Sequence, residues 1–155
     1  MVILGCSVLA MVVFIIDLLI KNHVESMEMD GEGQEKTLLG GRILLRRHHN
    51  QGAFLNVGER RRSLMTALSL ALTLGATVLF LVTFTYKGSG ILKAGLALLL
   101  GGAYSNTYDR LMRKYVVDYI SFPVKNKKIR NIVFNISDFC IMIGALLMVL
   151  GSADK

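Results

Sequence analysis

Charged residues are scarce in this sequence, and long stretches have none. Only 19 % of its 155 residues are charged, whereas 53 % are hydrophobic. No charge falls between Ser63 and Tyr86, and about 20 apolar residues are enough to cross a bilayer. A soluble domain of this length could not bury so much apolar side chain in one core. The composition therefore predicts an integral membrane protein.

Proline and cysteine are nearly missing as well. Pro123 is the only proline, so we expect the apolar stretches to form helices without proline kinks. The two cysteines, Cys6 and Cys140, both fall in apolar stretches, where a thiol usually behaves as a small hydrophobe. The cysteine pattern predicts neither a disulfide nor a metal site.

The first apolar stretch lacks the features of a cleaved signal peptide. It has no basic leader, and no small-x-small site precedes Lys21. The tetrapeptide Ile3-Leu4-Gly5-Cys6 is superficially like a lipoprotein acylation box. It lies too near the start, however, and the apolar residues follow it rather than precede it. We interpret this stretch as a membrane span.

Four apolar stretches predict an all-α polytopic membrane protein with four transmembrane helices, a single integral membrane domain over residues 1–155. The turn Lys87-Gly88-Ser89-Gly90 would make the second and third spans an antiparallel hairpin. The segment Thr37 to Phe54 predicts a short sheet at the membrane surface, in which Gly40-Gly41 would form a hairpin turn. The acidic stretch Glu25 to Glu35 is interpreted as solvated surface. The predicted spans cover residues 2–20, 63–86, 91–107 and 132–150.

The formal net charge of +7 does not indicate nucleic-acid binding, because the basic residues lie next to the spans. Lipid headgroups explain them better, so membrane lipid is a predicted partner and nucleic acid is not. The two large loops, 22–62 and 108–130, carry seven Lys or Arg residues each. Taken alone, the positive-inside rule would place both loops in the cytoplasm.

Ionisable side chains inside a bilayer cost roughly 2.5–3.5 kcal/mol each on insertion scales, so each one needs a reason. Asp17 and Lys21 are four residues apart and share a helix face. A structural ion pair at the interface would account for them without any function.

The end of the third span is also polar. Gly101-Gly102 would permit close helix contact. Asn106 and Asp109 follow on one helix face, and Asp109 with Arg110 could tie the helix end to the loop. Structure alone could explain this stretch.

Two further carboxylates are harder to explain by structure. Asp138 lies one to two turns into the last apolar stretch, where Asn135 shares its face, and Asp118 lies within an apolar patch. Such a carboxylate must be protonated, paired or open to a polar cavity. If Asp118 and Asp138 meet, repulsion and burial would make them share one proton near neutrality. One could then activate water while the other polarises a carbonyl, as in aspartic proteases. A small proton-coupled transporter that titrates Asp138 is the alternative.

Five stretches of the sequence together form a pattern, and they are Asp17-x3-Lys21, Asn50-x-Gly52-Ala53-Phe54, Gly101-Gly102-Ala103-x2-Asn106-x2-Asp109-Arg110, Val116-Val117-Asp118-Tyr119 and Phe134-Asn135-x2-Asp138. They occur in the order and spacing of signal peptidase II, the bacterial lipoprotein signal peptidase, and the sequence resembles that family over nearly its whole length. The third, fourth and fifth stretches together are highly specific, whereas the first alone would be worthless as evidence.

The resemblance implies a membrane aspartyl endopeptidase with a small extracytoplasmic β-cradle on four helices. Such enzymes remove the signal peptide from diacylglyceryl-modified prolipoproteins, cutting before the lipidated Cys. By position, Asp118 and Asp138 correspond to the catalytic pair. We expect no metal or organic cofactor, a lipidated prolipoprotein as partner, and a monomer. The substrate-binding or site-supporting residues implied are Asn50, Asn106, Asp109, Arg110, Asn135, Asp17 and Lys21.

The resemblance also implies a location. The family is multi-pass in the bacterial cytoplasmic (inner) membrane, with its active site near the outer leaflet and both large loops outside. The positive-inside count gives the reverse. We follow the motifs, because several residues in fixed order arise by chance less readily than a charge bias.

The sequence departs from the family pattern at four places. The Asn50 motif is one Ala short, Ser105 stands where Gly is usual, Ser137 where Ala is usual, and Tyr119 where Phe is usual. None of these removes a catalytic group. The shortened Asn50 loop and Ser137 leave open a non-catalytic relative that binds lipidated precursors without cutting them.

Overall fold

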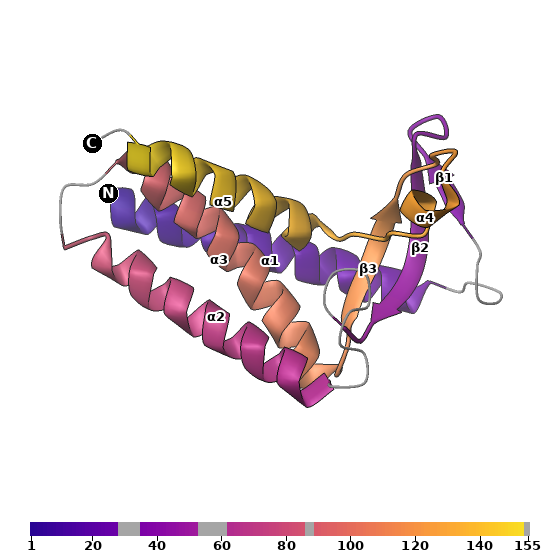
Figure 1. Ribbon diagram of the computed structural model, residues 1–155, viewed down its shortest axis with the longest axis horizontal. Helices are drawn as coiled ribbons and strands as arrows, with labels where there is room; N and C mark the ends of the chain where they lie inside the picture. Colours follow the sequence, from indigo (N-terminus) through magenta and orange to yellow (C-terminus); the bar gives the residue numbers. More distant parts are fainter. Residues whose placement is uncertain (28–34, 53–61, 86–88, 154–155) are drawn as a thin grey trace.

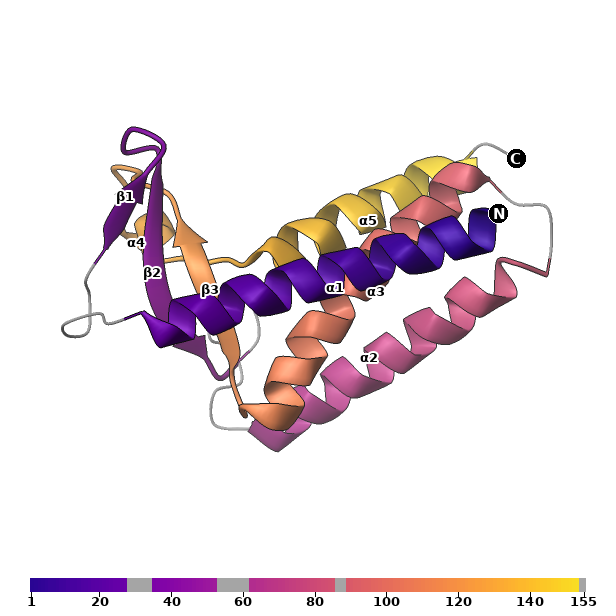
Figure 2. The ribbon, with the colours of Figure 1, turned by 180° about the vertical axis from the view of Figure 1, so that it is seen from behind.

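The computed structural model describes residues 1–27, 35–52, 62–85 and 89–153. Four long helices lie side by side, and a three-stranded sheet stands across one end of them (Figure 1). Both termini lie at the opposite end (Figures 1 and 2). The long helices are α1 (Val2–Ser26), α2 (Arg62–Val82), α3 (Gly90–Met112) and α5 (Ile136–Ala153), and α4 (Lys127–Arg130) is a short turn beside the sheet.

The helix α3 is the centre of the bundle and packs against α1, α2 and α5. Its Leu96 and Ala97 are completely buried. A Cβ atom on Gly101 would lie 2.7 Å from the Ala10 carbonyl oxygen of α1, and one on Gly102 would lie 2.5 Å from the Ser137 carbonyl oxygen of α5. The close helix contact predicted for Gly101-Gly102 is therefore confirmed.

The Gly102 contact gives a stability prediction. We expect Gly102→Ala to lower the free energy of unfolding by about 1–3 kcal/mol, since two backbones would have to separate. The control is Gly75→Ala in α2, where no atom lies within 4 Å of the added Cβ. Helix propensity there favours alanine by about 0.5–1 kcal/mol. Thermal unfolding in detergent compares the two, and a Gly102→Ala protein that melts no lower than Gly75→Ala would contradict the packing.

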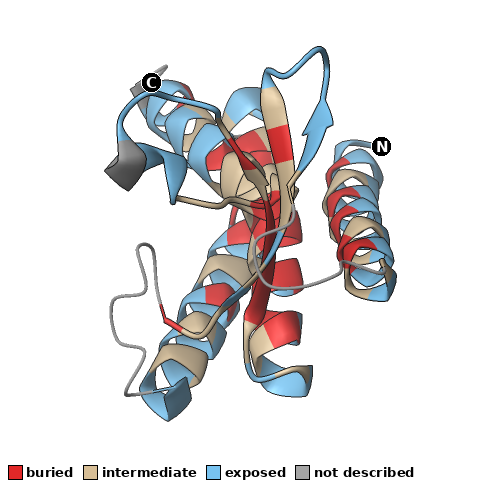
Figure 3. Cartoon of the chain, turned by 90° about the vertical axis from the view of Figure 1, so that its right-hand side faces the viewer, coloured by how far each residue is buried: buried red, intermediate tan, exposed pale blue. Residues whose placement is uncertain are grey.

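The outer faces of the bundle are apolar. Leu72 of α2 is 72 % exposed and Val149 of α5 is 66 % exposed, and exposed residues line the outer sides of the helices (Figure 3). Within the described residues, α1 and α2 are long and apolar enough to cross a membrane, and Ile136–Ser152 is a shorter apolar helix. Apolar area of this kind on the outside of a protein suits contact with lipid.

The sheet consists of antiparallel strands in the order β1 (Lys36–Leu38), β2 (Ile43–Asn50) and β3 (Val116–Ser121). The predicted turn at Gly40-Gly41 is confirmed, with φ angles of +65° and +85°, which glycine adopts without strain. The strand β3 was not predicted. Its Val117 and Tyr119 form a core with Val24 of α1. Helix α1 ends beside β3 (Figure 2).

The structure corrects several predicted helix bounds. The last long helix begins at Ile136 instead of residue 132, because Asn135 caps it. The first and third long helices run on to Ser26 and Met112, because Lys21 of the first forms a buried ion pair with Asp109 of the third. The second long helix ends at Val82 rather than residue 86. Of the predicted turn after it, Lys87-Gly88 lies outside the described residues.

Candidate active site

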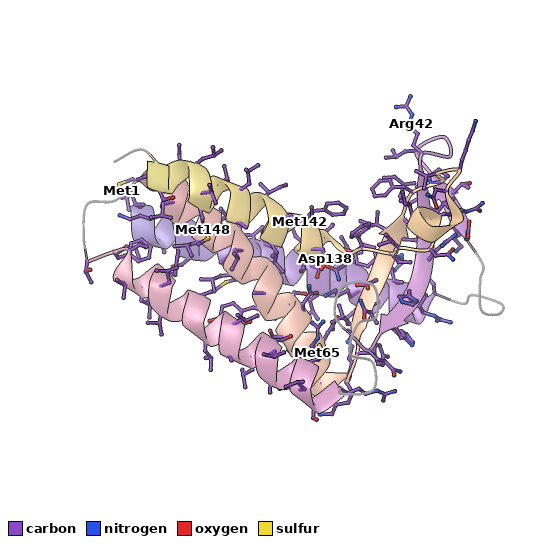
Figure 4. All side chains as sticks on the ribbon, in the orientation of Figure 1. Met1, Arg42, Met65, Asp138, Met142 and Met148 are labelled. Atoms are coloured by element: carbon purple, nitrogen blue, oxygen red, sulfur yellow. The ribbon has the colours of Figure 1, made fainter. Side chains whose placement is uncertain are left out.

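The N-terminus of α5 is closed by a reciprocal pair of hydrogen bonds. The Asp138 amide donates to Asn135 Oδ1 at 2.9 Å, and the Asn135 amide donates to Asp138 Oδ2 at 3.1 Å. This is a capping box, which satisfies amides that a helix start leaves unpaired. Asp138 thus lies in the first turn of its helix and not one to two turns inside it, at the junction of bundle and sheet (Figure 4). Asn106 of α3 also donates to it, at 3.0 Å.

Asp118 lies in the middle of β3 and is 2 % exposed. Its two oxygens accept hydrogen bonds from Asn135 Nδ2 at 2.7 Å and from Asn50 Nδ2 at 2.9 Å. Asn135 therefore contacts both Asp118 and Asp138. Neither aspartate forms an ion pair with any Lys or Arg that the structure describes.

Burial and the nearby charge of Asp138 raise the pKa of Asp118 to about 7. The hydrogen bonds from Asn50 and Asn135 act in the opposite direction and do not offset this. Near neutral pH the Asp118 carboxyl is therefore protonated in a large fraction of molecules, so it can donate a proton.

A buried charge cluster lies beneath the pair. Lys21 Nζ is 2.8 Å from Asp17 Oδ2 and 3.0 Å from Asp109 Oδ2, and all three side chains are completely buried. Lys21 also donates to Asn106 Oδ1 at 2.9 Å. The predicted Asp17–Lys21 ion pair is confirmed, and Lys21 joins helices α1 and α3 as well.

The prediction that Asp109 pairs with Arg110 is wrong. Asp109 faces Lys21 and also pairs with Arg113, whose Nε is 3.1 Å from Asp109 Oδ1. The reason is helical geometry, since residues four apart share a face and adjacent ones do not. Asp109 Oδ2 further accepts a hydrogen bond from the Val117 amide at 3.1 Å, so it does tie the helix end to β3.

Arg110 instead holds the segment after β2. Its Nη2 donates to the Gly52 carbonyl oxygen at 3.0 Å, and the Gly52 amide donates to Asn50 Oδ1 at 3.0 Å. These contacts keep the Asn50 amide on Asp118. Ala53 and Phe54 of the shortened motif lie outside the described residues.

Sequence reasoning gave no role to Ser105, Ser137 and Tyr119, yet all three hydroxyls donate to Asp17. The distances are 2.6 Å from Ser105 Oγ, 2.5 Å from Ser137 Oγ and 2.7 Å from Tyr119 Oη. Each of these residues departs from the family pattern. A hydroxyl gained at Ser105, Ser137 or Tyr119 is the sequence signal that could have pointed to a hydrogen-bonding role.

An apolar hollow of about 450 Å³ lies between α2, α3 and α5. Asn106 and Arg110 form part of its polar lining, so the hollow leads to the residue that donates to Asp138. No group of three or more metal-ligating His, Cys, Asp or Glu side chains occurs in the part of the chain that the structure describes. The arrangement can orient two carboxyl groups near an apolar hollow.

Comparisons with known proteins agree on one family. The family model described as "Signal peptidase (SPase) II" matches residues 9–153. A "Lipoprotein signal peptidase" of Lactobacillus johnsonii is 32 % identical over 141 residues, 91 % of this chain and 86 % of that protein. One of Shouchella clausii is 30 % identical over 148 residues, 92 % of this chain and 89 % of that protein.

The fold is also similar to solved structures. One described as a bacterial membrane enzyme superposes with a TM-score of 0.78 at 21 % identity, over 96 % of this chain and 87 % of that one. A second has a TM-score of 0.75 at 20 % identity, over 97 % and 94 %. At such identities the likeness shows the fold alone.

Proposed function

The chain belongs to the signal peptidase II family of membrane proteases, and we propose that it removes signal peptides from diacylglyceryl-modified prolipoproteins with a pair of aspartates. The observation that carries the proposed mechanism is the convergence of Asp118 and Asp138 on Asn135, without a paired cation among the described residues. Groups so placed can exchange a proton instead of serving only as ion-pair partners.

In the proposed reaction, Asp138 is the base and Asp118 the acid. Asp138, the less buried of the two, takes a proton from water while the water oxygen attacks the scissile carbonyl carbon. Asp118 gives its proton to the carbonyl oxygen, so a neutral gem-diol forms. The C–N bond then breaks, the amine nitrogen receives the proton from Asp138, and the gem-diol returns a proton to Asp118.

Neighbouring amides keep each carboxyl group in place during these steps. Asn106 and Asn135 fix the oxygens of Asp138, and Asn50 with Asn135 fixes those of Asp118. Such fixed donors favour reaction because the groups need not reorganise as charge develops.

The apolar hollow would receive an apolar part of the substrate. Leu72, Leu99 and Ile141 line it, and apolar side chains of this kind suit an acyl chain or a signal-peptide helix. The four long helices would cross the bacterial cytoplasmic membrane, with the sheet and the aspartate pair near the outer leaflet, in a protein that acts as a monomer. The apolar outer faces of α1, α2 and α5 support this arrangement.

The raised pKa of Asp118 predicts how the rate depends on pH. As pH rises through about 7, Asp118 loses its proton and the acid disappears. We expect kcat to fall by about tenfold per pH unit above that value. The folded protein also favours the protonated form of Asp118. The protonated carboxyl therefore stabilises the fold below the pKa that Asp118 has in the unfolded chain, and this stabilisation is lost as pH rises through about 7.

Two measurements between pH 5 and pH 9 check this expectation. One is the cleavage rate, and the other is the melting temperature of wild type and of Asp118→Asn, which should lack the fall near pH 7. A rate that still rises at pH 9 would contradict the assignment of Asp118 as acid.

The function itself is tested with two synthetic precursor peptides of the same sequence, one carrying diacylglyceryl on its Cys and one without it. Purified protein in detergent should cut the lipidated peptide just before the modified Cys, as mass spectrometry would show, and should leave the other nearly intact. Binding without any cut product would favour a non-catalytic relative.

A further inference from the structure

Asp17 lies behind the aspartate pair and contacts the chain neighbour of each member. Its Oδ1 accepts a hydrogen bond from Tyr119 at 2.7 Å, and its Oδ2 accepts one from Ser137 at 2.5 Å. Tyr119 follows Asp118 in β3, and Ser137 precedes Asp138 in α5. One carboxylate therefore joins the strand that carries one aspartate to the helix that carries the other.

Tyr119 also makes a second, direct link between β3 and α5. Tyr119 Oη also accepts a hydrogen bond from the Ile136 amide, the first residue of α5, at 3.2 Å. Successive strand residues point to opposite faces, so Tyr119 anchors β3 from the face opposite to Asp118. The strand is thus fixed from behind while Asp118 faces Asn50 and Asn135.

Asp17 itself is held rigidly. Lys21 Nζ lies 2.8 Å from it, and neither side chain is exposed. Ser137 is completely buried and Tyr119 is 2 % exposed, so water does not compete for these hydrogen bonds. Bonds to an ionised acceptor are shorter and stronger than neutral ones.

We propose that Ser137 and Tyr119 are positioning residues, which act through Asp17 to fix the separation between the carboxyl groups of Asp118 and Asp138. The proposal rests on the proposed function, because it assumes that this separation matters for peptide hydrolysis. The contacts place neither hydroxyl on Asp118 or Asp138 themselves, so their effect on the reaction is indirect.

Removal of the two hydroxyls should affect the rate more than substrate binding. We expect kcat to fall roughly 3- to 10-fold in Ser137→Ala or Tyr119→Phe and up to about 100-fold in the double variant, since misplacement near 1 Å can cost about 10². KM should stay within about twofold, because binding contacts are unchanged.

The range of pH over which kcat is high should become narrower in these variants. When the carboxyl groups of Asp118 and Asp138 move apart, their charges repel each other less, so the proton that the pair shares is lost more easily. The fall of kcat at high pH, the upper limb of the pH profile, therefore begins at lower pH. The other titratable or charged groups facing the pair stay the same in all variants, so they do not produce the shift. They are Asp17 and Lys21 of α1, Asp109 and Arg110 of α3, and His48 of β2, which is opposite Asp118 in the strand register.

The control is Thr83→Val, which also removes a buried hydroxyl hydrogen bond. Thr83 Oγ1 donates to the Phe80 carbonyl oxygen at 2.6 Å and is completely buried, just after α2 ends. This variant should lower the melting temperature and leave kcat and the pH profile as in wild type. A merely structural role for Ser137 and Tyr119 predicts the same behaviour for all of these variants.

The experiment measures kcat, KM and the pH profile with the lipidated precursor peptide, and the melting temperature against pH. The proposal is supported if kcat falls and the upper limb moves down in Tyr119→Phe, alone and with Ser137→Ala. It is overturned if kcat and the upper limb of the pH profile in these variants match those of wild type, or if Thr83→Val changes both by the same amount.

The melting temperature, measured against pH, separates this proposal from the proposed function. If wild type cuts no peptide, the proposed function fails, whereas the fall of the melting temperature near pH 7 still reports the carboxyl pair. That fall should move to lower pH in the variants, and an unmoved transition overturns the proposal. If Ser137→Ala does not fold, Tyr119→Phe, which keeps the ring, decides the outcome.

Discussion

Asn in place of Asp118 or Asp138 is expected to abolish cleavage, with a loss of about 10²–10⁴-fold or more in kcat/KM, the share that acid–base catalysis supplies. An amide can neither take a proton from water nor give one to the carbonyl oxygen. The amide oxygen can still accept one of the two hydrogen bonds that Asn50 and Asn135 donate to Asp118, whereas the amide NH2 group cannot accept the other. The melting temperature at pH 5 should fall only by what one lost hydrogen bond costs, about 1–3 kcal/mol, so most of the loss of rate should be chemical.

The matched control is Glu35→Gln. Glu35 pairs with Arg46 and Arg130 at the edge of the sheet, 25 % exposed, and has no contact with the aspartate pair among the hydrogen bonds of the described residues. We expect its cleavage rate to stay within about twofold of wild type, since these ion pairs lie at the edge of the sheet and do not touch either aspartate. Full activity in either aspartate variant would refute the catalytic assignment.

The second large effect is on stability. Lys21→Met should lower the free energy of unfolding by about 3–5 kcal/mol, the usual result of removing one partner from a buried ion pair. Asp17 and Asp109 would keep their charges in a completely buried position, although Arg113 still faces Asp109. With about 2–4 °C per kcal/mol for a chain of this size, the melting temperature should fall by about 6–20 °C.

An exposed lysine provides the control for that loss. Lys114→Met makes the same change at the surface, where Lys114 Nζ contacts only the Leu111 carbonyl oxygen in the hydrogen bonds described. Its effect should be within about 0.5 kcal/mol. Thermal unfolding in detergent compares both proteins. If Lys21→Met melts together with Lys114→Met, the buried cluster does not stabilise the fold.

The apolar stretches were enough to predict the long helices, because a run without charges has few other structures in a membrane protein. Their ends were not predictable in the same way. Asp109 was predicted to lie in the loop that begins at residue 108, yet α3 continues past it because Lys21 of α1 pairs with it. Lys21 and Asp109 are far apart in the sequence, so no local pattern reveals this contact.

The strand β3 was missed for a related reason. Both of its faces are buried, so it lacks the alternation of polar and apolar residues that identifies a half-exposed strand. The motifs did identify Asp118, Asp138 and Asn135 as a group. They did not reveal Asn135 as the residue that contacts both aspartates, or Asp17 as the acceptor of three hydroxyls.

The central claim is that Asp118 and Asp138 act as one unit on a lipidated precursor. The most direct test is the initial rate of cleavage of that peptide by wild type, by each single Asn variant and by the double variant Asp118→Asn/Asp138→Asn. Because residues that act together are strongly non-additive, the double variant should be no slower than either single variant. A single variant that retains cleavage which the double variant loses would show that the two aspartates act separately.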